Sequence, residues 1–149
     1  MGKGIKPLRP NWLRRRLAKW PLLPYRLGLG ILIARQVLIL TTRGRVSAKE
    51  RRTPLWYVSD GDNIYCLSGW GASSDWWKNL EASPKALLQI GMRRWELRGE
   101  VIAERQEVER ILPEFQKKYG RRTVGLFYHL DRLVLVIFPK TFQVQDDDR

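Results

Sequence analysis

Short apolar segments of β-strand length follow one another from residue 36 onwards, and turn residues separate them. The strongest turn signal is Asp60-Gly61-Asp62, because an Asp-Gly pair between two apolar runs is typical of a tight β-hairpin. A second hairpin is expected to turn over residues 91–94. This pattern favours antiparallel pairing and argues against alternating βαβ units. The expected strands are residues 36–42, 51–59, 63–68, 86–90, 95–103 and 133–138.

Two helices are expected among these strands. The first spans residues 75–82, with Ser73 or Ser74 as its N-cap and Pro84 after its end. The second spans 104–119, with acidic residues early and lysines late, as the helix dipole prefers. About six mostly antiparallel strands with flanking helices predict an α+β, mainly β fold, a small barrel or curled sheet. A chain of 149 residues can bury a core for one such domain.

Several side chains are expected in the core of that domain. Cys66 lies inside an apolar strand, and of the adjacent Trp76 and Trp77 one is expected to pack inward. Four further aromatic residues of the strands are expected to face the barrel interior, namely Trp56, Tyr57, Tyr65 and Trp95.

The chain divides into three predicted parts: a basic N-terminal segment at 1–23, the barrel domain at 24–141 and an acidic tail at 142–149. A helix over Trp12–Trp20 would place both tryptophans with Leu13 and Leu17 on one side and most of its basic residues on the other. Such a basic amphipathic helix suits an anionic membrane surface. Docking of the same apolar side on the domain's own core is the alternative.

The excess positive charge is confined to the first third of the chain. Residues 1–52 carry fourteen Lys and Arg against one acid, whereas residues 53–149 carry fourteen against fourteen. Such a field attracts a phosphorylated small molecule, an anionic bilayer or nucleic acid, although a solvated basic tail would look the same. Nucleic acid is the unlikely partner, because the basic third lacks the motifs of DNA- and RNA-binding modules.

A single cysteine and a single histidine, His129, exclude a disulfide framework and any recognisable zinc or haem spacing, so no metal is expected. The apolar run at 27–34 is shorter than the roughly 18 residues that a membrane span requires, and no secretory signal peptide fits. The expected location is cytoplasmic, with peripheral association at the inner membrane face as an option. The expected assembly is a monomer or a homodimer.

Three segments contain the parts of a phosphate site: residues 41–47, 51–55 and 68–73. They combine turn amides, arginines and the N-terminus of the helix at 75–82, and these groups bind phosphates in many proteins. Pro54 cannot donate to a β-ladder and so predicts an edge strand or a bulge. Gly69 and Gly71 would let a flat ring approach the backbone.

An ordered set of motifs resembles the deazaflavin-dependent nitroreductase family: LILTTRGRVSAKERRTPL at 38–55, DGD at 60–62, Ser68, Gly71 and WKNLEASP at 77–84. The resemblance covers roughly residues 24–138. It implies a split β-barrel of the FMN-binding type that transfers hydride from reduced coenzyme F-420 to a small acceptor such as a quinone, enone or nitro compound. FMN is the alternative cofactor, and a non-catalytic ligand-binding barrel is the alternative function.

The resemblance also implies which residues contact the cofactor, while hydride transfer requires no catalytic acid or base from the protein. Asn79 is expected to brace the loop that begins at Ser68, and Tyr128 is the candidate on the acceptor side. Val46 and Gly69 stand where the family usually has lysine, and Ala48 where it has glycine; Arg43, Lys49 and Arg52 are the nearby cations that could substitute. The implied cofactor-binding residues are Arg43, Arg45, Ser47, Arg51, Thr53, Pro54, Ser68, Gly69, Trp70, Gly71 and Asn79.

Overall fold

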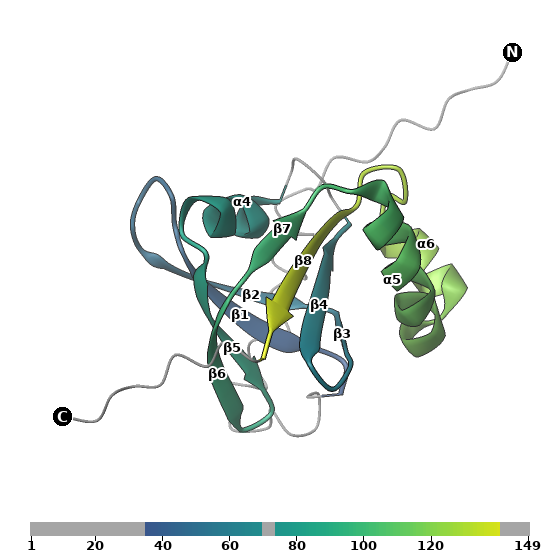
Figure 1. Cartoon of the computed structure of the whole chain (residues 1–149), viewed down its shortest axis with the longest axis horizontal. Helices are drawn as coiled ribbons and strands as arrows, with labels where there is room; N and C mark the ends of the chain where they lie inside the picture. The colour runs from purple at the N-terminus through teal and green to yellow at the C-terminus, as the bar shows by residue number, and fades with distance from the viewer. Residues whose placement is uncertain (1–34, 70–73, 141–149) are drawn as a thin grey trace, which may run out of the picture.

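The computed structural model describes residues 35–69 and 74–140 (Figure 1). These residues form eight strands and three helices. The strands are β1 (Leu38–Arg43), β2 (Glu50–Leu55), β3 (Tyr57–Ser59), β4 (Asn63–Ser68), β5 (Lys85–Ile90), β6 (Arg93–Arg98), β7 (Glu100–Ile102) and β8 (Val134–Pro139). The helices are α4 (Asp75–Ala82), α5 (Arg105–Tyr119) and α6 (Arg121–Phe127).

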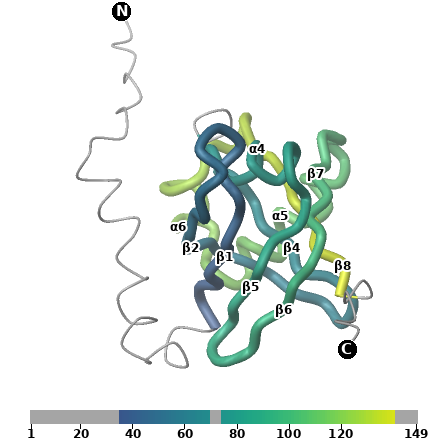
Figure 2. Tube along the Cα trace, turned by 90° about the vertical axis from the view of Figure 1, so that its left-hand side faces the viewer, coloured from purple at the N-terminus to yellow at the C-terminus, as the bar shows by residue number. Residues whose placement is uncertain are grey.

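The strands form two antiparallel sheets, ordered β2-β1-β5-β6 and β3-β4-β8-β7. Figure 2 shows the first sheet turned toward the viewer. The two sheets join at two corners, because β2 runs on into β3 at Trp56 and β6 runs on into β7 at Gly99. Each strand predicted at 51–59 and 95–103 is therefore one run of chain that bends from one sheet into the other. Counted in this way the barrel has about six strands, and the predicted mainly β fold is confirmed.

The corner at Gly99 depends on the missing side chain. A Cβ there would lie 2.8 Å from Cε1 of Phe138 and 3.2 Å from Cδ1 of Leu80, closer than carbon atoms normally pack. The Gly99 amide donates a hydrogen bond to the carbonyl oxygen of Pro84 at 2.9 Å. Glycine thus lets the chain turn directly over the barrel core.

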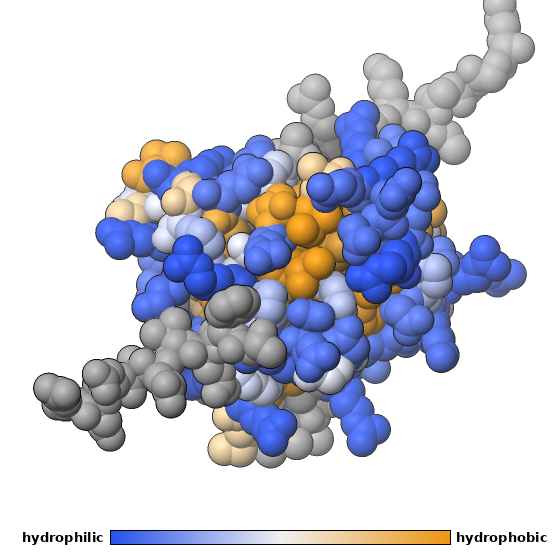
Figure 3. Space-filling model, in the orientation of Figure 1, coloured by the Kyte–Doolittle hydropathy of each residue, from blue (hydrophilic) through white to orange (hydrophobic). Residues whose placement is uncertain are grey.

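The sheet β3-β4-β8-β7 is buried on both faces, because its side chains alternate between two cores. Ile64 and Cys66 point into the barrel, where Cys66 is fully buried as predicted. Tyr65 and Leu67 point the other way, against α5 and α6. Figure 3 shows apolar side chains in the middle of one face, over β7 and β8, where this second layer comes close to the surface.

Two of the predicted inward-facing aromatic residues belong to the second core instead. Tyr57 and Trp95 do pack on the barrel core. Trp56 lies outside the barrel and stacks on Tyr119 with ring centroids 4.6 Å apart, and Tyr65 faces α5. The prediction was wrong for these two because the strands are apolar on both faces, so alternation alone does not tell which face is the interior.

The helices match the prediction except for α6. Helix α4 has the predicted bounds and buries Trp76, while the Ser74 side chain makes no capping hydrogen bond. Helix α5 ends at Tyr119, because the next residue, Gly120, has a φ of 89° that a helix cannot contain, and α6 starts directly after Gly120. Helix α6 was missed because Arg121–Phe127 is short and has a glycine and few apolar positions. The hairpin turn between β5 and β6 is also shorter than predicted, since β6 already starts at Arg93.

Some predictions lie outside the described residues. These are the helix at Trp12–Trp20, the loop residues Trp70 and Gly71, and the acidic tail. Within residues 35–69 and 74–140, no helix has the length and apolar character needed to cross a membrane.

Candidate functional site

The loop between β1 and β2 is tied to helix α4 through Arg45. The Arg45 amide and its Nη1 both donate to Oδ1 of Asn79, at 3.2 and 3.0 Å. The Arg45 Nη2 forms an ion pair with Oδ1 of Asp75 at 3.1 Å. Asp75 is mostly exposed, so this ion pair contributes well under about 1 kcal/mol, and the amide contacts fix the loop. The first of the three predicted segments, residues 41–47, therefore contacts α4, the helix that the third segment precedes.

Asn79 is the buried polar anchor of this contact. It is 4 % exposed, and its Nδ2 donates to Oγ1 of Thr42 at 3.5 Å, a long hydrogen bond to a residue that is itself buried. Asn79 was predicted to brace the loop that begins at Ser68. Its described hydrogen bonds go to β1 and the β1–β2 loop, so it sets the position of Arg45. Residues 70–73 of the loop that it was predicted to brace lie outside the described residues, so that role stays a prediction.

The β1–β2 loop is closed by its own backbone. The Gly44 amide donates to the Lys49 carbonyl and the Ala48 amide donates to the Gly44 carbonyl, both at 2.8 Å. Ala48 has a φ of 55°, in the left-handed region that glycine adopts without strain. This conformation accounts for the glycine that the family usually has there. Val46, which replaces a lysine of the family pattern, is 93 % exposed at the tip of the loop.

The strand β2 is an edge of its sheet, as Pro54 predicted. Its register places Arg51 opposite Thr42 and Thr53 opposite the inward-facing Leu40, so Arg51 and Thr53 share the inner face. Arg51 also donates from Nη2 to Oγ of Ser47 at 3.4 Å. The other candidates lie on the outer face of this strand pair, namely Arg43, Arg52 and Pro54.

Ser68 ends β4 and has a buried hydroxyl that no described residue pairs with. Ser68 is 2 % exposed, and its Oγ makes no hydrogen bond to any described group. Leaving a buried hydroxyl unpaired costs about 1–3 kcal/mol, so such a group usually has a use. Residues 69–74 connect Ser68 directly to α4, the helix that carries Asn79. A donor is therefore available beside the segments predicted to hold an anionic cofactor.

Gly69 follows Ser68 and lies directly under the ring of Tyr128. A Cβ on Gly69 would lie 1.9 Å from Cδ1 of Tyr128, and the His129 amide donates to the Gly69 carbonyl at 2.8 Å. Gly69 was predicted to let a flat ring approach the backbone, and in the structure that ring is the side chain of Tyr128. Tyr128 packs further on Trp56 and Phe115, and burial raises the pKa of its hydroxyl. The candidate on the acceptor side therefore contacts the start of the predicted cofactor loop.

Most of the predicted site residues that the structure describes fall into two groups. Arg45, Ser47, Arg51, Thr53 and Asn79 gather around the β1–β2 loop and α4. Ser68, Gly69 and Tyr128 meet at the end of β4. Sequence reasoning missed the bridging role of Asp75 and Thr42, although the helix dipole favours an acid in the first turn of a helix. Within the described part of the chain, no three His, Cys, Asp or Glu side chains lie together as a metal site would need.

Solved structures share this fold at low sequence identity. A protein solved as a domain-swapped dimer matches with a TM-score of 0.60 and 21 % identity, over 85 % of this chain and 96 % of that one. A Listeria innocua protein named as a pyridoxamine 5′-phosphate oxidase matches with a TM-score of 0.52 and 17 % identity, over 76 % and 94 % of the two chains. These likenesses confirm the split-barrel fold.

Sequence comparison identifies the family. A relative named as an F420H(2)-dependent quinone reductase, Rv3178 of Mycobacterium tuberculosis (strain ATCC 25618 / H37Rv), is 33 % identical over 91 residues, which are 59 % of this chain and 76 % of the relative. The family described as F420H(2)-dependent quinone reductase matches residues 26–128. The match confirms the predicted resemblance and favours coenzyme F-420 over FMN as the cofactor. The chain belongs to the F420H(2)-dependent quinone reductase family, whose members are F-420-dependent oxidoreductases.

Proposed function

We propose that this protein reduces a small quinone with F-420H2 and holds the anionic tail of the cofactor between the β1–β2 loop and the loop that follows β4. The buried, unpartnered hydroxyl of Ser68 carries this proposal, because it is a donor at the start of the predicted cofactor loop with no described acceptor. The acceptor class follows from the family and from the relative's name. Enones and nitro compounds are further acceptors that the sequence resemblance implies.

Each proposed contact has a physical role. Arg45 is held by Asn79 and Asp75, so its guanidinium is oriented before a ligand arrives. Among the described residues, the side chain of Arg51 makes one long hydrogen bond, to Ser47 at 3.4 Å, and this contact is weak enough to be exchanged for a phosphate. Arg43 and Arg52 lie on the outer face and would reach only a tail that wraps over the β2 edge. When bound, the cofactor supplies the hydride, and the protein's part is to orient it and exclude water.

Tyr128 is proposed as the residue that faces the acceptor. Its ring lies on Gly69, so the segment between α6 and β8 is in contact with the proposed cofactor loop. Three further properties stay predictions. They are the monomeric or homodimeric state, the cytoplasmic location and the association of residues 12–20 with an anionic membrane.

The test is a titration of the purified full chain with F-420, followed by tryptophan fluorescence, and then an assay of menadione reduction by F-420H2. A Kd below about 100 μM, equivalent to roughly 5.5 kcal/mol, and turnover of menadione are expected. Binding without turnover of any quinone would favour the non-catalytic barrel. Failure to bind F-420 would refute the proposal.

The variant Ser68→Ala tests whether the Ser68 hydroxyl contacts the cofactor. Ser83→Ala, at the other end of α4, is the matched control. Because the Ser68 hydroxyl has no described partner, its removal should leave the stability of the cofactor-free protein unchanged or slightly higher. Its loss should weaken F-420 binding about tenfold, equivalent to about 1.4 kcal/mol. A Ser68→Ala protein that is less stable and binds F-420 normally would show that the hydroxyl has a structural role only.

A further inference from the structure

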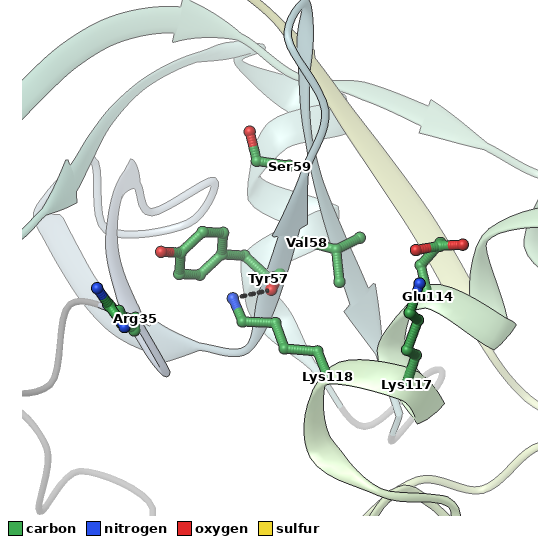
Figure 4. Close-up of a pocket in the computed structure, with 7 residues that line it drawn as sticks. All are labelled: Arg35, Tyr57, Val58, Ser59, Glu114, Lys117 and Lys118. Atoms are coloured by element: carbon green, nitrogen blue, oxygen red, sulfur yellow. Dashed lines mark hydrogen bonds between the residues drawn. The ribbon is translucent and has the colours of Figure 1, made fainter.

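A cavity of about 530 Å³ opens between β3 and α5, outside the proposed cofactor site (Figure 4). It is lined by Tyr57 and Ser59 of β3, by residues of α5 and by Arg35. Leu55, two residues before Tyr57, pairs with Leu38 at the start of β1, whereas Arg45 follows the end of β1. A strand of this length spans roughly 20 Å, so the cavity lies at the opposite end of the strand pair from the Arg45 loop.

The central feature of the cavity is the ammonium group of Lys118. Its Nζ donates to the Tyr57 carbonyl at 2.7 Å and lies 3.6 Å from the centroid of the Tyr57 ring. Figure 4 shows the lysine reaching from α5 across to β3. These contacts fix the position of the charge at the cavity wall.

Lys118 has hydrogen-bonding capacity left over. An ammonium group has three N–H donors, and one is used by the Tyr57 carbonyl. That carbonyl also accepts from the Tyr119 hydroxyl at 2.9 Å, so both of its lone pairs are engaged. In the part of the chain that the structure describes, no carboxylate forms an ion pair with Lys118. Partial burial without a counter-charge lowers the pKa of Lys118 to about 8.

The surrounding charges are mostly positive. Arg35 and Lys117 also line the cavity, and Glu114 is its single acidic lining residue. Lys140 lies next to it, because its Nζ donates to Oγ of Ser59 at 3.0 Å. Several cations around a cleft with one carboxylate create a local field that attracts anions.

We infer that this cavity is a second anion-binding site, which takes a small molecule through a phosphate or carboxylate group held by Lys118, with Arg35 and Lys117 at the rim. The cavity is wide open to solvent, and its volume of about 530 Å³ is large enough to admit a small molecule. An oxyanion would accept a hydrogen bond from the Lys118 ammonium group and supply the missing counter-charge. The inference does not use the proposed F-420 contacts of the β1–β2 loop, which lie at the other end of β1.

The test is an NMR titration of the full-length, cofactor-free protein with inorganic phosphate and, separately, with succinate, at constant ionic strength set with sodium chloride. Saturable shifts of the Tyr57, Ser59 and Lys118 amides are expected, with a Kd below about 10 mM for at least one of the two anions. Shifts confined to the Arg45 and Ser47 amides would place the anion at the cofactor site and overturn the inference. Linear, non-saturating shifts with both anions would also overturn it.

Variants separate a specific site from general attraction to a basic protein. Lys118→Gln should weaken binding at least about tenfold, because a charge-assisted hydrogen bond is lost. Lys85→Gln on β5 removes the same charge from the other sheet and should leave the affinity within about twofold. Lys118→Arg keeps the cation and should retain binding, and it serves as the test if Lys118→Gln fails to fold. Equal weakening by Lys118→Gln and Lys85→Gln would refute the site.

Discussion

The substitution Gly69→Ala adds one methyl group, and its effect on stability should show how tightly the end of β4 packs against Tyr128. In Gly69→Ala the new Cβ would lie 1.9 Å from Cδ1, 2.6 Å from Cγ and 2.8 Å from Cε1 of that ring. Carbon atoms in contact lie about 3.5–4.0 Å apart, so ring or backbone must move by roughly 1.5 Å. The perturbation is therefore steric and local.

The ring has little room to retreat. Its centroid lies 5.4 Å from that of Trp56 and 6.3 Å from that of Phe115, and the three rings belong to the core under α5 and α6. Forcing an extra carbon into such packing typically costs about 1–3 kcal/mol. Alanine also lowers the conformational entropy of the unfolded chain, which stabilises the folded protein by about 0.4–1 kcal/mol and offsets part of that cost. We expect Gly69→Ala to lower the free energy of unfolding by about 1–2 kcal/mol.

Urea unfolding followed by tryptophan fluorescence measures this change, because a domain of this size usually unfolds in two states. Gly61→Ala is the matched control, since a Cβ at Gly61 would meet nothing within 4 Å. A double-mutant cycle with Tyr128→Ala isolates the contact, and on that background Gly69→Ala should cost almost nothing. An equal cost on both backgrounds, or no cost in the wild-type protein, would refute the reasoning.

Three other outcomes are expected. Asn79→Ala should lower the free energy of unfolding by about 1–3 kcal/mol and weaken F-420 binding by loosening Arg45, whereas Asn79→Asp keeps the acceptor and should lose less in both measurements. Gly99→Ala should cost about 1–3 kcal/mol in thermal unfolding, because its Cβ would lie 2.8 Å from Phe138; an unchanged Tm would mean that the corner is not tightly packed. Burial lowers the pKa of Lys118 to about 8, so at pH 8 a far larger share of its amine is neutral than for the exposed lysines, and mass spectrometry should find it acetylated faster. At pH 6, well below this pKa, acetylation of Lys118 should fall to a small fraction of its rate at pH 8; an unchanged rate would contradict the lowered pKa.

Most strands were predictable because short apolar runs and the Asp60-Gly61 turn are local signals. The two barrel corners were not, because the chain stays extended through Trp56 and Gly99 and only the pairing partner changes. Pairing is a long-range property that the alternation of one strand does not encode. For the same reason Trp56 and Tyr65 were predicted on the wrong side of the sheet.

The sequence predicted which segments form the candidate site, but it did not predict which residues contact one another there. Motif order placed Arg45 and Asn79 in the same site, and the structure joins them directly. Arg43 and Arg52 share the outer face because of the register between β1 and β2. No local sequence signal fixes that register. The contact between Gly69 and Tyr128 joins residues far apart in the chain, so it could be found only in three dimensions.

The placement of Cys66 gives the protein an internal reporter of unfolding. It is the only cysteine of the chain, it is fully enclosed in the barrel, and burial raises the pKa of its thiol. An alkylating reagent needs the thiolate and therefore reaches it only when the barrel opens. The rate of alkylation then follows the population of open molecules, and a bound ligand should slow it without any introduced label.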